Sequence, residues 1–278
     1  MPNQHDDTDA LSAGLLSAAE GAAYEVVNAS GCGPIVLVCE HASPMIPAAL
    51  NGLGLDELAR SSHAAWDIGA FAVALRLSAL FDAPLVASRV SRLVYDCNRA
   101  PGAPGAITPK SEIYDVPGNV GLSAAATQLR EVGVYHPFRR ALERTLAGSI
   151  ARAAQADAPP VILVTMHSFT PVYYGVQRKV ELGVLHGQDD RLAQTMLPAA
   201  QASGWAAELN APYGPTDGVS HTLDIHGAAG GVLNVMFELR NDLISDEAGC
   251  DAAAQMLHSV IASGLPAVAQ ESQAKRVR

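Results

Sequence analysis

The stretch PVILVTMHS, residues 160–168, is an apolar run that stops at a histidine and a serine. A short, continuous run of this kind, rich in β-branched residues, is typical of a strand buried on both faces of a sheet. Such strands belong to largely parallel sheets covered by helices, where ligands bind beyond the carboxyl ends of the strands. The stretch therefore predicts an α/β fold with a site near His167 and Ser168.

The same alternation of apolar runs and helical patterns continues along the chain. PIVLVCEH (34–41) is a strand candidate, and WDIGAFAVALRLSALF (66–81) has apolar residues at helical spacing. Further strands are predicted at 83–90, 91–97, 179–187, 204–210 and 232–240, and further helices at 48–60, 122–155 with a break or fresh start at Pro137, 189–203, 220–231 and 246–263. We therefore predict a three-layer α/β/α fold with a mostly parallel central sheet.

The chain organisation predicted from these patterns is simple. We assign residues 1–20 to a mobile leader, residues 21–270 to a single α/β domain and residues 271–278 to a basic tail. Residues 101–120 carry four prolines and several glycines, which indicates a long surface loop. Long loops often border sites, so we expect this one to lie near the ligand.

The charge balance limits the partners of the protein. The 278 residues include 28 acidic and 18 basic ones, giving a formal net charge of −10, and no Lys/Arg cluster precedes AKRVR at 274–278. Nucleic-acid binding needs a basic footprint and is therefore not expected. Because an acidic surface repels anions at long range, an anionic substrate would need arginines in its own pocket.

Cysteine usage and hydropathy suggest a location. The four cysteines show no CxxC spacing, the first ten residues are polar and acidic, and no uninterrupted 18-residue apolar stretch occurs. We therefore expect a cytoplasmic protein that does not span a membrane.

Chemically capable residues follow four of the predicted strands. They are Glu40 and His41, then Asp96, Asn98 and Arg99, then His167 and Ser168, then Glu238 and Arg240. A parallel sheet brings such ends to one edge. Two imidazoles and a carboxylate are typical ligands of a catalytic zinc, and a further carboxylate can relay the proton of an activated water. Glu238 suits the role of base, and Arg99 suits a substrate clamp.

The motifs CEHASPMIP, HAAWDIGA, SRLVYDCNRAP, TMHSFTP and FELRNDLIS, spread over residues 34–245, resemble in order those of the N-formylglutamate amidohydrolase family. That family is a zinc-hydrolase branch similar to carboxypeptidases and aspartoacylases. The resemblance implies a zinc carboxypeptidase-like, phosphorylase/hydrolase-like fold, about one Zn²⁺ per chain, and cleavage of an N-acyl amino acid. N-formylglutamate, giving glutamate and formate, or a related N-acyl acidic amino acid is the implied substrate.

The resemblance also implies residue roles. EHAS gives His41 as the first metal ligand, and MHSF gives His167 as the second. CNR matches a pair that holds a substrate carboxylate, here Asn98 and Arg99. FELR resembles the segment that carries the general base, so the catalytic residues implied are Glu238, with Arg240 close by.

The third metal ligand departs from the wider pattern. Carboxypeptidase-like enzymes place a glutamate three residues after the first histidine, whereas this chain has Pro44. We predict Asp67, in the WDIG motif, as the replacement. Glu40 is the alternative, although a residue adjacent to His41 would face the opposite side of a continuing strand.

Other residues admit two interpretations. Arg178 is either a solvated loop residue or an additional cation for an acidic substrate, and His226 either contacts substrate or packs near Gly227. Arg92 and Asp96 are expected to form a structural ion pair. Two alternatives to a metal hydrolase remain at this stage: a cysteine hydrolase that uses Cys39, and a non-catalytic binding protein with a relict site.

Overall fold

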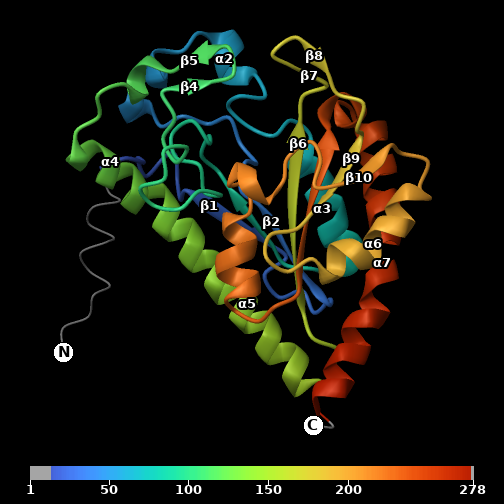
Figure 1. Cartoon of the computed structure of the whole chain (residues 1–278). Helices are drawn as coiled ribbons and strands as arrows, with labels where there is room; N and C mark the ends of the chain where they lie inside the picture. Colours follow the sequence, from blue (N-terminus) through green and yellow to red (C-terminus); the bar gives the residue numbers. More distant parts are fainter. Residues whose placement is uncertain (1–13, 277–278) are drawn as a thin grey trace, which may run out of the picture.

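The computed structural model describes residues 14–276, and its centre is a seven-stranded sheet (Figure 1). The strand order is β1-β3-β2-β6-β11-β9-β10. The bounds are β1 Tyr24–Val27, β2 Ile35–Cys39, β3 Leu85–Ser88, β6 Ile162–Phe169, β9 Leu182–Leu185, β10 Ala207–Leu209 and β11 Asn234–Arg240. Two separate hairpins are formed by β4 Lys110–Ser111 with β5 Tyr114–Asp115, and by β7 Val172–Tyr173 with β8 Val176–Gln177.

The central strands are parallel and completely buried. Strands β3, β2, β6 and β11 run in one direction, while β1 pairs antiparallel with β3 and β9 pairs antiparallel with β11. All residues of β2 and β6 are buried, as continuous Val, Ile and Leu runs require. Register pairs His167 on β6 with Glu238 on β11, so both side chains point to the same side of the sheet.

Helices cover both faces of the sheet, which confirms the predicted three-layer α/β arrangement. Helices α3, α6 and α7 pack on one face around a core that includes Leu77, Met196 and Leu257, and α5 covers the other around Phe138 and Leu142 (Figure 1). The α-helices are α2 Glu57–Ser61, α3 Ala70–Phe81, α4 Ala124–Arg130, α5 His136–Gln155, α6 Arg191–Gln201 and α7 Glu247–Arg276. The remaining helical segments are η1 Ala48–Gly54, η2 Pro117–Asn119, η3 Glu131–Tyr135, η4 Pro215–Asp217, η5 Leu223–Ala228 and η6 Asn241–Ile244, of which η3 and η5 are π-helical.

Several predicted elements differ in the structure. Residues 91–97, predicted as a strand, form turns, because their polar and charged side chains bond to neighbouring segments rather than to a strand ladder. Within the predicted loop 101–120, the β4–β5 hairpin forms. The helix predicted at 48–60 is divided into η1 and α2 by the extended backbone of Leu55 and Asp56, and η1 itself contains residues with left-handed backbone, including Asn51 and Gly52. Pro137 lies in the first turn of α5, directly after the π-helical η3.

The structure describes only part of each end of the chain. Residues 1–13 and 277–278 lie outside the described residues. Within the range that we assigned to a leader, Leu15 is buried in the core, and within the assigned tail α7 continues to Arg276. By length and composition, residues 247–269 of α7 could cross a membrane. However, Leu257 and Ile261 of this helix are buried in the core, so it does not indicate a membrane protein.

Candidate metal centre and cavity

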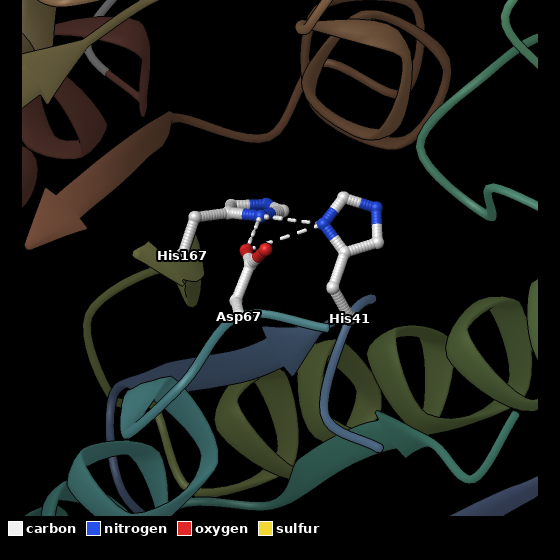
Figure 2. A group of neighbouring side chains, drawn as sticks. All are labelled: His41, Asp67 and His167. Carbon is white, nitrogen blue, oxygen red and sulfur yellow. Dashed lines mark hydrogen bonds and ion pairs between the residues drawn. The ribbon is translucent and has the colours of Figure 1, made fainter. Parts of the chain in front are cut away.

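Three buried side chains from distant parts of the chain meet at the carboxyl end of the sheet. His41 Nδ1 lies 3.2 Å from Asp67 Oδ2, His167 Nδ1 lies 2.9 Å from the same oxygen, and the two Nδ1 atoms are 3.2 Å apart. Figure 2 shows the two imidazoles and the carboxylate pointing toward one another. This is the trio that the sequence analysis predicted from strand ends and the WDIG motif.

Local structure explains how the trio is assembled. His41 lies two residues beyond β2, and His167 is near the end of the neighbouring strand β6. Asp67 sits in the turn before α3, where its backbone N–H donates to the carbonyl of His41 at 2.9 Å. The turn depends on Gly69, because its φ is +81° and a Cβ there would lie 2.3 Å from the carbonyl oxygen of Ile244.

Each imidazole contacts a second carboxylate through its outer nitrogen. His41 Nε2 donates to Asp96 Oδ1 at 2.7 Å, and His167 Nε2 lies 3.2 Å from Glu40 Oε2. A proton held on Nε2 leaves the lone pair on Nδ1, which faces the cluster, and this is the usual support of a metal-bound histidine. Glu40, our alternative metal ligand, therefore lies behind His167 and does not join the trio.

Arg92 forms ion pairs with Asp67 and Asp96. Its guanidinium lies 3.2 Å from Asp67 and 2.8 Å from Asp96. The predicted ion pair with Asp96 is confirmed, although it forms across a turn and not along one face of a strand. The arginine thus holds in place both carboxylates that contact His41.

The charges of the cluster require a compensating positive charge. Burial alone lowers the pKa of His167, but Glu40 and Asp67 outweigh burial and raise it well above its usual range. Burial favours a protonated Asp67, yet His41, His167 and Arg92 hold its pKa low. The buried carboxylates thus exceed the permanent positive charge of Arg92, and only protons on the histidines or a bound cation can balance them.

The donor atoms also have the spacing of a metal site. Ligands at about 2.0–2.1 Å from a tetrahedral zinc lie roughly 3.3 Å from one another. The three distances in the cluster, 2.9, 3.2 and 3.2 Å, are close to that value. Donor types, charge and spacing therefore fit a divalent ion, and His41, Asp67 and His167 could hold one.

Replacing Asp96 by asparagine is expected to weaken metal binding about 10–100-fold, because the outer nitrogen of His41 loses its charged acceptor. A titration against a chromophoric chelator measures the affinity. Glu131→Gln is the matched control, since Glu131 contacts His136 at 3.1 Å away from the cluster. Equal affinities for Asp96→Asn and the unchanged protein would show that Asp96 does not support a metal ligand.

Glu238 stands beside the trio as a buried carboxylate. Burial raises its pKa to about 7, and its Oε2 atom has no hydrogen-bond partner in the described part of the chain. Gly183, its partner on β9, makes room here: a Cβ at that position would lie 2.1 Å from the carbonyl oxygen of Ala211. A carboxylate with a pKa near neutrality and a free oxygen is suited to accept and return a proton.

His41 and His167 of the trio line a cavity of about 540 Å³ that contains three arginines. Arg92, Arg99 and Arg178 all line it. Among the described residues neither Arg99 nor Arg178 forms an ion pair with a carboxylate, so both are available to an anion. An acidic protein therefore carries the local arginines that an anionic substrate requires.

Arg178 is held by aromatic rings. Its Cζ atom lies 4.4 Å from the ring centre of Tyr173, 4.9 Å from Tyr213 and 5.5 Å from Phe169. Its Nη1 also donates to the carbonyl of Thr170 at 3.3 Å. Stacking orients the planar guanidinium without neutralising it, which leaves its charge available to a carboxylate.

Asn98 and Arg99 form hydrogen bonds with the backbone of residues 218–222. The Asn98 amide donates to the carbonyl of Val219 at 2.5 Å and accepts from the N–H of Thr222 at 3.0 Å, while Arg99 Nη1 donates to the carbonyl of Gly218. Both residues line the cavity, and Asn98 keeps one amide N–H and one lone pair of its amide oxygen beyond these two hydrogen bonds. In this structure Asn98 positions the 218–222 segment, and Arg99 retains further donors for a ligand.

Three residues singled out from the sequence lie elsewhere. Arg240 does not line the cavity; its guanidinium binds Asp242 and Glu181 and donates to the backbone carbonyl of Arg178. His226 is buried behind the cavity in η5, where burial lowers its pKa to about 4. Cys39 lies in the core, and burial raises the pKa of its thiol well above the usual range, so it does not provide a nucleophilic thiolate.

The structure gives two residues named from the sequence a different role and adds others. Asp96 and Glu40 contact the outer nitrogens of the histidines, and His63, Glu112 and Tyr213, which we did not predict as site residues, line the cavity. A signal existed only for Asp96 and Glu40, because both directly follow apolar runs. The other three lie in loops, where spacing along the chain says little about which segments meet.

Comparisons with known proteins show which proteins the chain is similar to. The family model for N-formylglutamate amidohydrolase matches residues 33–245. The crystal structure of a gene product from Agrobacterium tumefaciens is 48% identical, with a TM-score of 0.86 over 91% of this chain and 99% of that one. The N-formylglutamate amidohydrolase from Ralstonia eutropha JMP134 shares the fold at 15% identity, with a TM-score of 0.55 over 90% of this chain and 99% of that one. A search of curated proteins gave no significant match.

Proposed function

The chain belongs to the N-formylglutamate amidohydrolase family, and from that premise we propose that it is a zinc-dependent enzyme that hydrolyses N-formylglutamate or a related N-acyl acidic amino acid. One observation supports the proposal most directly. The cluster of His41, Asp67 and His167 opens into a cavity lined by arginines within a protein of net charge −10. A metal-type donor set beside an anion-binding wall suits the hydrolysis of an anionic amide.

The proposed mechanism assigns each group a task. A zinc ion held by the cluster would polarise the amide carbonyl and make a water molecule more acidic. Glu238, as a carboxylate, accepts a proton from the attacking water at its unpaired oxygen and then donates it to the leaving nitrogen. Arg178 and Arg99 bind the carboxylates of the substrate, which fixes the amide near Glu238. The products are the acid, formate in the simplest case, and the free amino acid.

The proposed setting follows from the cysteines. All four are free thiols, and three of them are buried. Free thiols suit a reducing compartment, so we place the enzyme in the cytoplasm with a small molecule as its substrate.

The test is a panel of N-acyl amino acids supplied to the zinc-loaded protein. N-formylglutamate and N-acetylglutamate are expected to be hydrolysed faster than N-formylleucine. Arg178→Met is expected to raise KM for the acidic substrates about 10–100-fold, because a charge-assisted hydrogen bond is lost. The KM for N-formylleucine should change little.

The matched control is Arg139→Met, since Arg139 pairs with Glu143 on the surface of α5. It should leave every KM unchanged. No turnover of any member of the panel would reject the proposed function. Preference for the neutral substrate would reject the acidic class alone.

A further inference from the structure

The carboxylate of Glu112 connects the β4–β5 and β7–β8 hairpins beside the cavity. Figure 1 shows the β4–β5 and β7–β8 hairpins at the end of the molecule where β6 finishes. Glu112, in the β4–β5 turn, accepts a hydrogen bond at Oε1 from the backbone N–H of Tyr174 in the β7–β8 turn, at 2.8 Å. The Tyr174 hydroxyl donates in return to the Glu112 carbonyl at 3.4 Å.

The same carboxylate reaches a third segment. Glu112 Oε2 accepts from His63 Nε2 at 2.7 Å, and the Glu112 side chain is only 8% exposed. His63 lies in the turns that lead to Asp67. Glu112 therefore links both hairpins to the segment that delivers a residue of the metal cluster.

Both turns contain unfavourable backbone at the residues that bond to each other. The φ of Glu112 is +50° and that of Tyr174 is +48°, in the left-handed region that a bulky side chain rarely adopts. Such conformations persist only where surrounding contacts maintain them. The hydrogen bonds between Glu112 and Tyr174 are contacts of this kind.

The link leads directly to the substrate side of the cavity. Tyr173 precedes Tyr174, and its ring stacks on Arg178. His63, Glu112, Tyr173 and Arg178 all line the cavity. In contrast, His167 and Glu238 lie on β6 and β11, and His41 lies two residues beyond β2. Within the described residues, the Glu112 carboxylate bonds to His63 and Tyr174 and to none of these three.

We propose that Glu112 is a positioning residue for substrate binding. Its hydrogen bonds to Tyr174 and His63, which we call the latch, join the two hairpins at the cavity and so hold in place the wall formed by Tyr173 and Arg178. The inference rests on the proposed function for its kinetic consequence. The latch itself is a structural link and can be measured without turnover.

Glu112→Ala is expected to raise KM for an N-acyl acidic amino acid about tenfold, because the wall that carries Arg178 loses its anchor. The value of kcat should stay within about threefold, since β6 and β11 still carry His167 and Glu238, and Asp67 is still held by the His41 carbonyl and by Arg92. Glu112→Gln should restore KM, because its amide oxygen can accept from Tyr174 and its amide nitrogen can donate to His63. Hydrogen exchange of the Tyr174 amide should accelerate in Glu112→Ala and remain slow in Glu112→Gln.

Glu131→Ala is the control, since it breaks another Glu–His contact outside the cavity. It should change neither KM nor the exchange of Tyr174. Unchanged exchange in Glu112→Ala would overturn the latch, and so would a fall in kcat at constant KM. If exchange accelerates but no panel substrate is hydrolysed, the latch stands and the proposed function fails.

Discussion

His167→Ala is expected to lose the bound metal and to lower kcat/KM at least about a thousandfold, since a Lewis acid worth several kcal/mol of transition-state stabilisation is removed. His167 supplies one of three donor atoms, and the remaining pair, His41 and Asp67, cannot close a tetrahedral site. Elemental analysis should give about one zinc per chain in the unchanged protein and close to none in the variant. The rate is measured with the best substrate of the panel.

Folding must be followed in the same experiment. His167 lies between Asp67 and Glu40, so its removal takes the ion-pair partner of the buried Glu40 and leaves Asp67 with His41 and Arg92 alone as charged partners. Circular dichroism reports whether His167→Ala folds, and His167→Asn provides a smaller change that keeps a polar group in the gap. His136→Ala is the control, because His136 is a partly exposed residue that contacts Glu131. Full metal content and full activity in a folded His167 variant would refute the metal centre.

Glu238→Gln is expected to lower kcat about 10²–10⁴-fold while KM and the metal content stay close to those of the unchanged protein. Glutamine fills the same volume but cannot accept a proton from water. The variant therefore separates proton transfer from binding, and it also separates an active enzyme from a relict site. Steady-state kinetics at saturating zinc measures both constants, with Glu131→Gln as the control.

The pH profile gives an independent test of the same role. Burial raises the pKa of Glu238 to about 7, and a proton acceptor is active only as the carboxylate. Activity must therefore fall as the pH decreases through that pKa. A cation beside Glu238 favours its charged form, so the acid limb is expected at or below about pH 7 in the zinc enzyme. If the limb persists unchanged in Glu238→Gln, another group is responsible for it.

The central strands and the main helices could be predicted from the sequence because their signals are local. IVLVC in β2, the apolar run of β6 and the helical spacing of α3 each depend on residues within a few positions of one another. The hairpins could not be predicted in the same way. Their two-residue strands are too short to show a period, and their turns place Glu112 and Tyr174 in left-handed conformations that no residue type there indicates.

Local sequence patterns were enough to predict the parallel sheet, the edge at which the site lies, and the chemical groups at the ends of β2, β6 and β11. Which of these groups meet could be seen only in the folded chain: Asp67 joins the histidines, whereas Glu40 contacts the outer nitrogen of His167 and Arg240 binds Asp242 and Glu181. The reason is geometric. A contact such as that of Asp67 with His167 spans 100 residues, so it depends on how the whole chain closes and not on local spacing.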